Sequence, residues 1–78
     1  MSAAEAQEVK DLLLQRDDQF RQLFEQHSRL DNRLLELTSR PYLSHLEQLE
    51  QVTLKKQKLR LKDQMEQIVR QYAQTRAS

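Results

Sequence analysis

The sequence predicts an all-α protein, an antiparallel two-helix hairpin of coiled-coil character. The 78 residues include no glycine and a single proline, and the commonest residue types are good helix formers. Apolar residues recur at heptad spacing on both sides of that proline. We therefore expect one domain over residues 1–78, with a first helix at about 3–38, a loop at about 39–44, a second helix at about 45–73 and a frayed tail at 74–78.

The first helix is expected to begin at a capping box formed by Ser2 and Glu5. Its apolar pattern then lapses across residues 15–19. The absence of glycine and proline favours a continuous helix with one solvated turn. The alternative is a break near 16–19, in which Asp17 caps a new helix.

A regular apolar seam follows, with steps that alternate between three and four residues: Phe20, Leu23, His27, Leu30, Leu34 and Leu37. Pro41 interrupts the helical pattern, and Ser44 with Glu47 forms a second capping box. The second helix carries its own seam of Leu46, Leu49, Leu54, Leu61, Met65, Ile68 and Tyr72. A short connection between two such helices makes them antiparallel neighbours.

Each seam has one polar interruption, and folding about Pro41 places the two in the same layer. The two interruptions are His27 and Lys58. Asp31 lies one turn beyond His27 and could bridge to His27, Lys55 or Lys58, so the polar layer consists of His27, Asp31 and Lys58. The simplest interpretation is a contact that fixes the register of the two helices at some cost in stability. A site for an anion or for a partner's carboxylate is the alternative, and catalysis is the least favoured.

Five apolar residues lie outside the expected seam: Phe24, Leu35, Val52, Leu59 and Val69. A two-helix chain with one apolar stripe per helix is marginally stable by itself. We therefore expect these residues to form an interaction surface, most simply in a homodimer that completes a four-helix bundle. Binding of another, unidentified protein is the rival hypothesis.

A basic run occupies the second helix: Lys55, Lys56, Lys58, Arg60 and Lys62. It is the basis of an alternative function, an accessory protein that binds nucleic acid. The first half of the chain is net acidic and can neutralise much of this charge. No aromatic side chain is interleaved with the run to stack on bases, so nucleic acid is the less favoured partner.

Three stretches of the sequence resemble the YdcH-like family of short bacterial proteins. They are Phe20-x-x-Leu23, His27-x-x-Leu30-Asp31 and the stretch from Leu54 to Asp63, and the resemblance covers roughly residues 12–69. It implies a cytosolic helical hairpin and no known activity, so it assigns no functional residue. His45 and Leu46 depart from the acidic residues that the family pattern has there.

Several kinds of chemistry find no support in the sequence. There is no cysteine for a disulfide or a thiolate metal site, no glycine-rich loop for phosphate, and no metal-ligand spacing between the two histidines. We expect no enzyme, cofactor, metal or small-molecule substrate. With no signal peptide or membrane span recognisable, we expect a cytoplasmic, non-enzymatic interaction or adaptor module.

Overall fold

The computed structural model describes residues 2–77, with side chains for residues 2–75, and all its regular elements are helices. They are α1 (Ala3–Arg16), α2 (Asp18–Thr38) and α3 (His45–Ala77). The all-α class is confirmed, but the chain forms three helices where two were expected. α3 continues through residues 74–77, which were expected to fray, and Ser78 lies outside the described residues.

The first expected helix is divided at Asp17, the less favoured of the two interpretations. Asp17 has an extended backbone (φ −113°, ψ 110°), and its Oδ1 accepts a hydrogen bond of 2.9 Å from the Phe20 N–H. Arg21 donates to the carbonyls of Leu14 and Gln15 at 3.0 and 3.1 Å. Backbone groups that the break leaves without helical partners are thus satisfied on both sides of it. One aspartate and one arginine therefore allow a turn without glycine or proline.

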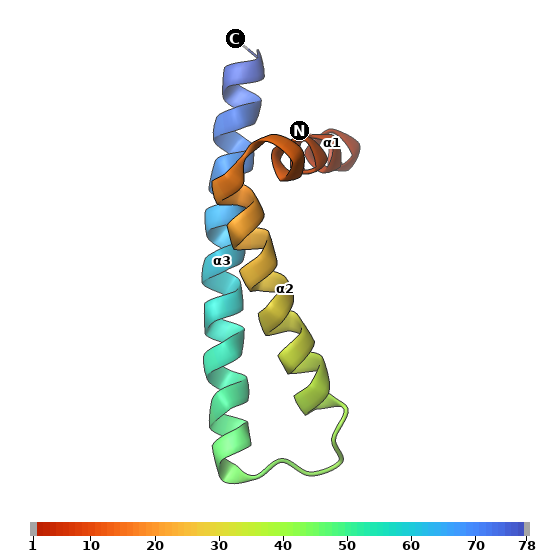
Figure 1. Ribbon diagram of the computed structural model, residues 1–78, viewed down its shortest axis with the longest axis vertical. Coiled ribbons are helices and arrows are strands. Elements are labelled where there is room, and N and C mark those ends of the chain that lie inside the picture. The colour runs from red at the N-terminus through yellow and green to blue at the C-terminus, as the bar shows by residue number, and fades with distance from the viewer. Residues whose placement is uncertain (1, 78) are drawn as a thin grey trace.

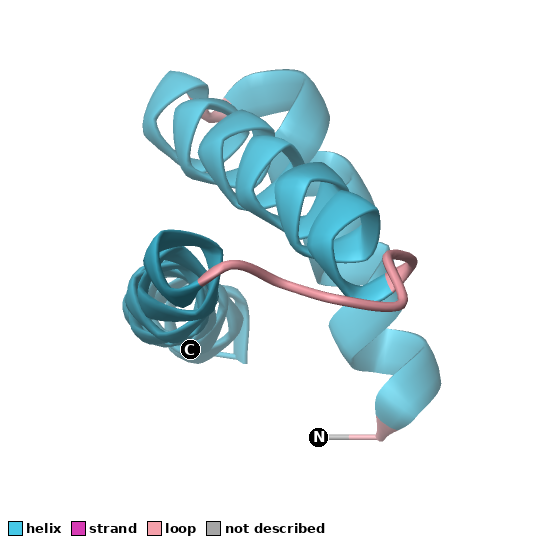
Figure 2. Cartoon of the chain, turned by 90° about the horizontal axis from the view of Figure 1, so that it is seen from below, coloured by secondary structure: helices cyan, strands magenta, loops and turns pink. Residues whose placement is uncertain are grey.

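α2 and α3 lie side by side in opposite directions, and α1 turns away from them at the end remote from the loop (Figure 1). Seen along the long axis, α2 slants across α3 and α1 projects to the side (Figure 2). The molecule measures 51 × 20 × 18 Å. Within residues 2–77, no helix has both the length and the apolar character needed to cross a membrane.

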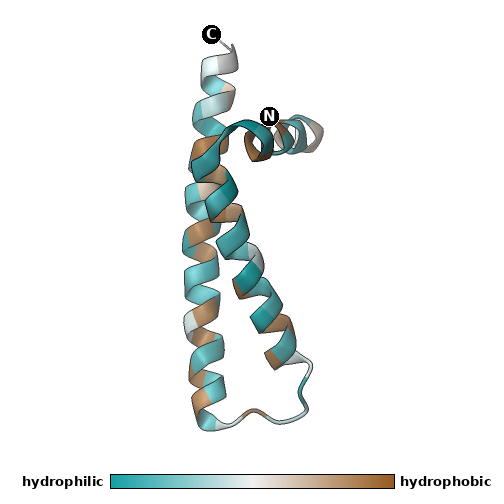
Figure 3. Ribbon diagram, viewed as in Figure 1, coloured by the Kyte–Doolittle hydropathy of each residue, from teal (hydrophilic) through white to brown (hydrophobic). Residues whose placement is uncertain are grey.

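The main core lies where the three helices meet, and we call it the junction core. It consists of Val9 and Leu13 from α1, Phe20 from α2 and Val69 from α3. Partly buried residues surround it: Leu14, Met65, Ile68 and Tyr72. Apolar segments converge at this point (Figure 3). A helix of 14 residues is marginal alone in water, so packing of Val9 and Leu13 stabilises α1.

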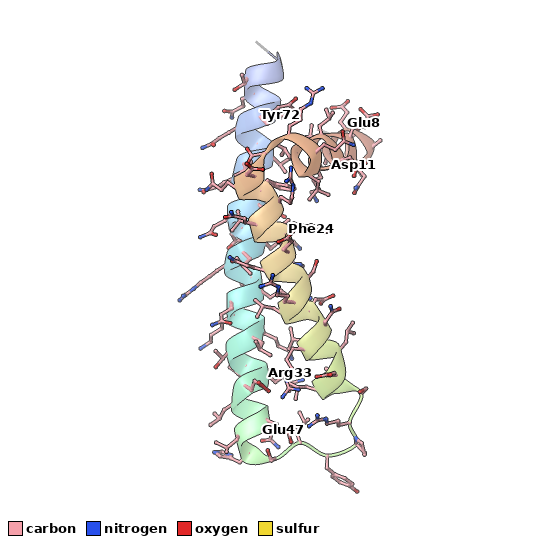
Figure 4. All side chains as sticks on the ribbon, viewed as in Figure 1. Glu8, Asp11, Phe24, Arg33, Glu47 and Tyr72 are labelled. Carbon is pink, nitrogen blue, oxygen red and sulfur yellow. The ribbon has the colours of Figure 1, made fainter. Side chains whose placement is uncertain are left out.

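At the opposite end, which we call the loop end, α2 and α3 diverge (Figure 1). Ion pairs connect them there. Arg33 reaches from α2 toward α3 (Figure 4), with Nη2 at 2.7 Å from Glu50 Oε1, and also pairs with Glu36 at 2.8 Å. Arg40 pairs with Glu47. These groups remain partly exposed, so the loop end relies on interactions that water weakens.

Two leucines of α2, Leu34 and Leu37, are buried near the loop end. The facing turns of α3 contribute much less, because Leu46 is 77% exposed and Leu49 53% exposed. Both had been assigned to the seam of the second helix. The helices diverge at Leu46, and the helical rotation turns Leu49 away from α2.

α3 begins at the capping box expected from the sequence. Ser44 Oγ accepts from the Glu47 N–H, and Glu47 Oε1 accepts from the Ser44 N–H, both at 3.1 Å. The Ser44 backbone N–H is the main reason why the pKa of Glu47 lies below its ordinary value; burial opposes the shift, and Arg40 adds to it. A matching cap at Ser2, which accepts from the Glu5 N–H at 3.2 Å, begins α1.

Candidate functional site

The expected polar layer is centred on an ion pair between Lys58 of α3 and Asp31 of α2. Lys58 also donates a hydrogen bond to Asp31, and this bond is the main reason why the pKa of Asp31 lies below its ordinary value. Burial opposes the shift, and the charges of Lys58 and His27 add to it. The pair therefore joins the two helices directly. His27 lies nearby on α2, and its side chain forms no hydrogen bond with residues 2–75.

Next to this pair, residues of all three helices line an open hollow of about 440 Å³, which we call the junction hollow. Its apolar lining comes from Leu14, Phe20, Phe24 and Met65. Its polar lining comes from Gln7, Lys10, His27, Lys58, Lys62 and Glu66. The hollow thus combines an apolar floor next to the junction core with a rim that carries three ammonium groups and one carboxylate.

The cations of the rim differ in their pairing. Lys58 is engaged by Asp31, whereas Lys10 and Lys62 form no ion pair or hydrogen bond with any side chain of residues 2–75. They belong to α1 and α3, so it is the return of α1 to the other helices that brings them to one hollow. Two lysines without a carboxylate partner make the rim electropositive.

Comparison with known proteins identifies one family. The family of proteins of unknown function named DUF465 matches residues 20–69. The chain belongs to this family. The matched segment holds most of α2, the loop and most of α3, while α1 precedes it. No curated protein and no solved structure matches the chain.

The DUF465 segment supplies most of the junction hollow, from Phe20 to Glu66, and α1 adds only Gln7, Lys10 and Leu14. The sequence pattern had placed Lys58 in a polar layer and Lys62 in a basic run, without connecting either to α1. The sequence analysis favoured a continuous helix at Asp17, and only the break at that residue lets α1 turn and bring Lys10 to the hollow.

The other flank of the α2–α3 pair carries a second hollow, of about 490 Å³. Its lining is Gln26, Arg29, Leu30, Gln57, Arg60, Leu61 and Gln64. It has two guanidinium groups but is bounded by two helices only, and its apolar lining is limited to two leucines. It therefore provides less enclosed apolar surface than the junction hollow.

The expected basic patch is divided between two faces of α3. Lys58 and Lys62 line the junction hollow, Arg60 lines the other hollow, and Lys55 and Lys56 are exposed elsewhere. Successive residues of a helix are rotated by about 100°, so a short basic run necessarily covers several faces. Lys55, Lys58 and Lys62 follow at steps of three and four residues and share one face of α3, whereas Lys56 and Arg60 lie on another.

The expected apolar interaction surface is also divided. Val69 is 4% exposed and belongs to the junction core, so its assignment to an outer surface is wrong; α1 folds back and covers this region. Phe24 lines the junction hollow and is 41% exposed. Leu35 lies on α2, and Val52 and Leu59 lie on α3, each more than half exposed.

Val52 and Leu59 join Leu49 in what we call the outer stripe of α3. The helical rotation places these three residues within about 80° of one another and about half a turn from the inward-facing Leu61 and Met65. Steps of three and seven residues give the stripe the spacing of a coiled-coil seam. Because Leu49 was counted in the inner seam, the outer stripe was only partly recognised from the sequence.

The chemistry available in the described residues is electrostatic and apolar. Within residues 2–77, no three histidine, aspartate or glutamate side chains gather in a way that would hold a metal ion. His27 is the only imidazole in the junction hollow, and the single carboxylate there is Glu66. The arrangement is suited to holding an anion against an apolar surface.

Proposed function

We propose that this protein is a small non-enzymatic module that acts through helix–helix contact, with a second copy of itself as its partner. The observation that carries the proposal is the outer stripe, whose three members Leu49, Val52 and Leu59 are all more than half exposed. A coiled-coil spacing on the solvent side of a helix that already packs on its other side is typical of a helix with two neighbours.

An antiparallel pairing of two α3 helices would bury the side chains of this stripe. With the two-fold axis near Leu54, Leu49 of one copy lies opposite Leu59 of the other, and His45 lies opposite Asp63. The resulting four-helix assembly would have both α3 helices at its centre. The imidazole and carboxylate at the ends favour the antiparallel alignment, and the aliphatic stem of Lys56 can cover Val52 of the second copy.

A matched pair of variants tests the proposal. Leu59 on the outer stripe and Leu35 on α2 are almost equally exposed, at 59% and 60%. Leu59→Glu should abolish self-association measured by multi-angle light scattering, because it places a carboxylate against Leu49 of the second copy in an apolar contact. Leu35→Glu should leave the mass unchanged. Equal effects of the two substitutions would contradict a contact made through the outer stripe.

A further inference from the structure

We propose that the junction hollow binds one small amphipathic anion: a carboxylate or phosphate head group carried on an aliphatic chain. The observation behind this inference is that an apolar floor and unpaired cations share one hollow formed by three helices. None of the three outer-stripe residues lines this hollow, so the site does not depend on the proposed self-association.

The floor of the hollow suits an aliphatic chain. Phe20 is fully buried in the junction core, and Phe24, which also lines the hollow, is 41% exposed. Leu14 and Met65 complete the apolar lining from the other two helices. A hydrocarbon chain placed here would remove part of Phe24 from water, which is favourable in proportion to the apolar area covered.

The rim suits an anionic head group. Lys10 and Lys62 approach from different helices and have no carboxylate partner among residues 2–75. His27 adds ring nitrogen atoms to the same rim. Glu66 opposes an anion, but Lys10 and Lys62 outnumber it. Lys10 is half-buried, and an ammonium group that is partly withdrawn from water attracts an anion more strongly than an exposed one does.

The dimensions favour a single small molecule over a protein helix or a membrane. A volume of about 440 Å³ lies within the range of roughly 300–1,000 Å³ that is usual for small-molecule sites. A partner helix needs a long groove, and a membrane surface needs an extended apolar face. Here residues from all three helices line one hollow.

Binding would also affect the packing of α1. Lys10 and Leu14 belong to α1, which is otherwise anchored through Val9 and Leu13. A ligand that contacts Lys10 and Lys62 together would bridge α1 to α3. The melting temperature should therefore rise with ligand concentration, since the ligand binds only where α1 is packed.

Octyl phosphate, used well below its micelle concentration, is a suitable probe. We expect saturable binding by calorimetry, with amide shift changes in residues around Lys10, Phe24 and Lys62. Octanol has the chain without the charge, and inorganic phosphate has the charge without the chain. Either compound alone should bind at least roughly tenfold more weakly, because each lacks one of the two recognised features.

Charge-matched variants locate the site. Lys62→Gln and Lys10→Gln should each weaken octyl phosphate binding by roughly tenfold, as expected for loss of one charge-assisted hydrogen bond. Lys62→Arg should keep most of the affinity. Lys55→Gln removes the same charge from an exposed position of α3 outside the hollow and should change the affinity less than about twofold.

Four results would overturn the proposal. They are absence of saturable binding, octanol binding as tightly as octyl phosphate, equal weakening by Lys55→Gln and Lys62→Gln, and binding to vesicles of anionic phospholipid without binding to monomeric octyl phosphate. The last result would assign the cations to a membrane surface. Self-association measured on the same variants reports on the outer stripe separately.

Discussion

Different interactions hold the helices together at the two ends of the molecule. At the junction, three helices bury Val9, Leu13, Phe20 and Val69 almost completely. At the loop end, only α2 and α3 are present, and ion pairs such as Arg33–Glu50 take a larger part. The apolar residues in the C-terminal half of α3 are thus buried by the other helices, whereas several of those in its N-terminal half are exposed to solvent.

The difference shows what the break at Asp17 contributes. By turning back, α1 becomes a third neighbour and covers apolar residues that two helices leave in water. The loop end has no such neighbour within residues 2–77, and its exposed leucines are the place where a second copy would pack. The following substitutions test this contrast, from the largest expected effect to the smallest.

Removing the ring at the centre of the junction should have the largest effect. Phe20→Ala should lower the free energy of unfolding by about 3–5 kcal/mol, because it removes a fully buried side chain and leaves a cavity. Leu46→Ala at the loop end should cost less than about 0.5 kcal/mol, since Leu46 is mostly exposed. Urea unfolding followed by circular dichroism, at one protein concentration, measures both losses in the free energy of unfolding. Similar losses for the two variants would contradict the contrast between the junction and the loop end.

Removing the cap that turns α1 should have an intermediate effect. Asp17→Ala should lower the free energy of unfolding by about 0.5–2 kcal/mol, because the Phe20 N–H loses its acceptor. Nuclear Overhauser contacts between Leu13 and Val69 should weaken as α1 leaves the junction. Glu25→Ala, which removes an equal charge from an exposed position of α2, should preserve those contacts; their equal loss in both variants would show that Asp17 does not act as the cap.

Acidification should have the smallest effect, shared between Glu47 at the loop end and Asp31 of the polar layer, because the pKa values of both are lowered. The pKa of Glu47 lies below its ordinary value of 4.5 in the folded state. Its contribution to stability is therefore complete above pH 4.5 and is lost as the pH falls through the lowered folded-state pKa. The melting temperature should decline in that range, and Glu47→Gln should reduce the decline. Glu8→Gln on α1, an exposed control, should not; an equal reduction there would contradict this assignment.

Local chemistry allowed much of the fold to be predicted. Ser44 and Glu47 defined the start of α3, and the composition defined the all-α class. The turn at Asp17 was recognised only as an alternative, because the arginine that satisfies the carbonyls of Leu14 and Gln15 follows the break and carries no local signal. Val69 was misplaced as a direct result, since its burial requires the returning α1.

The candidate site was predictable only in part for the same reason. The sequence placed Asp31 and Lys58 in one layer because both lie on helices that pair about Pro41, and the two side chains do form an ion pair. The junction hollow depends also on Lys10, whose position is set by the turn of α1 and not by heptad spacing. Residues brought together by a third helix cannot be paired from the periodicity of the other two.

The measurement that most directly tests the open loop end is sedimentation equilibrium of the unmodified chain from about micromolar to hundreds of micromolar. The account predicts that the mass rises with concentration from the 9.4 kDa of one chain to twice that value. A mass that remains at 9.4 kDa over the whole range would contradict it, because the outer stripe of α3 would then stay exposed without a second copy.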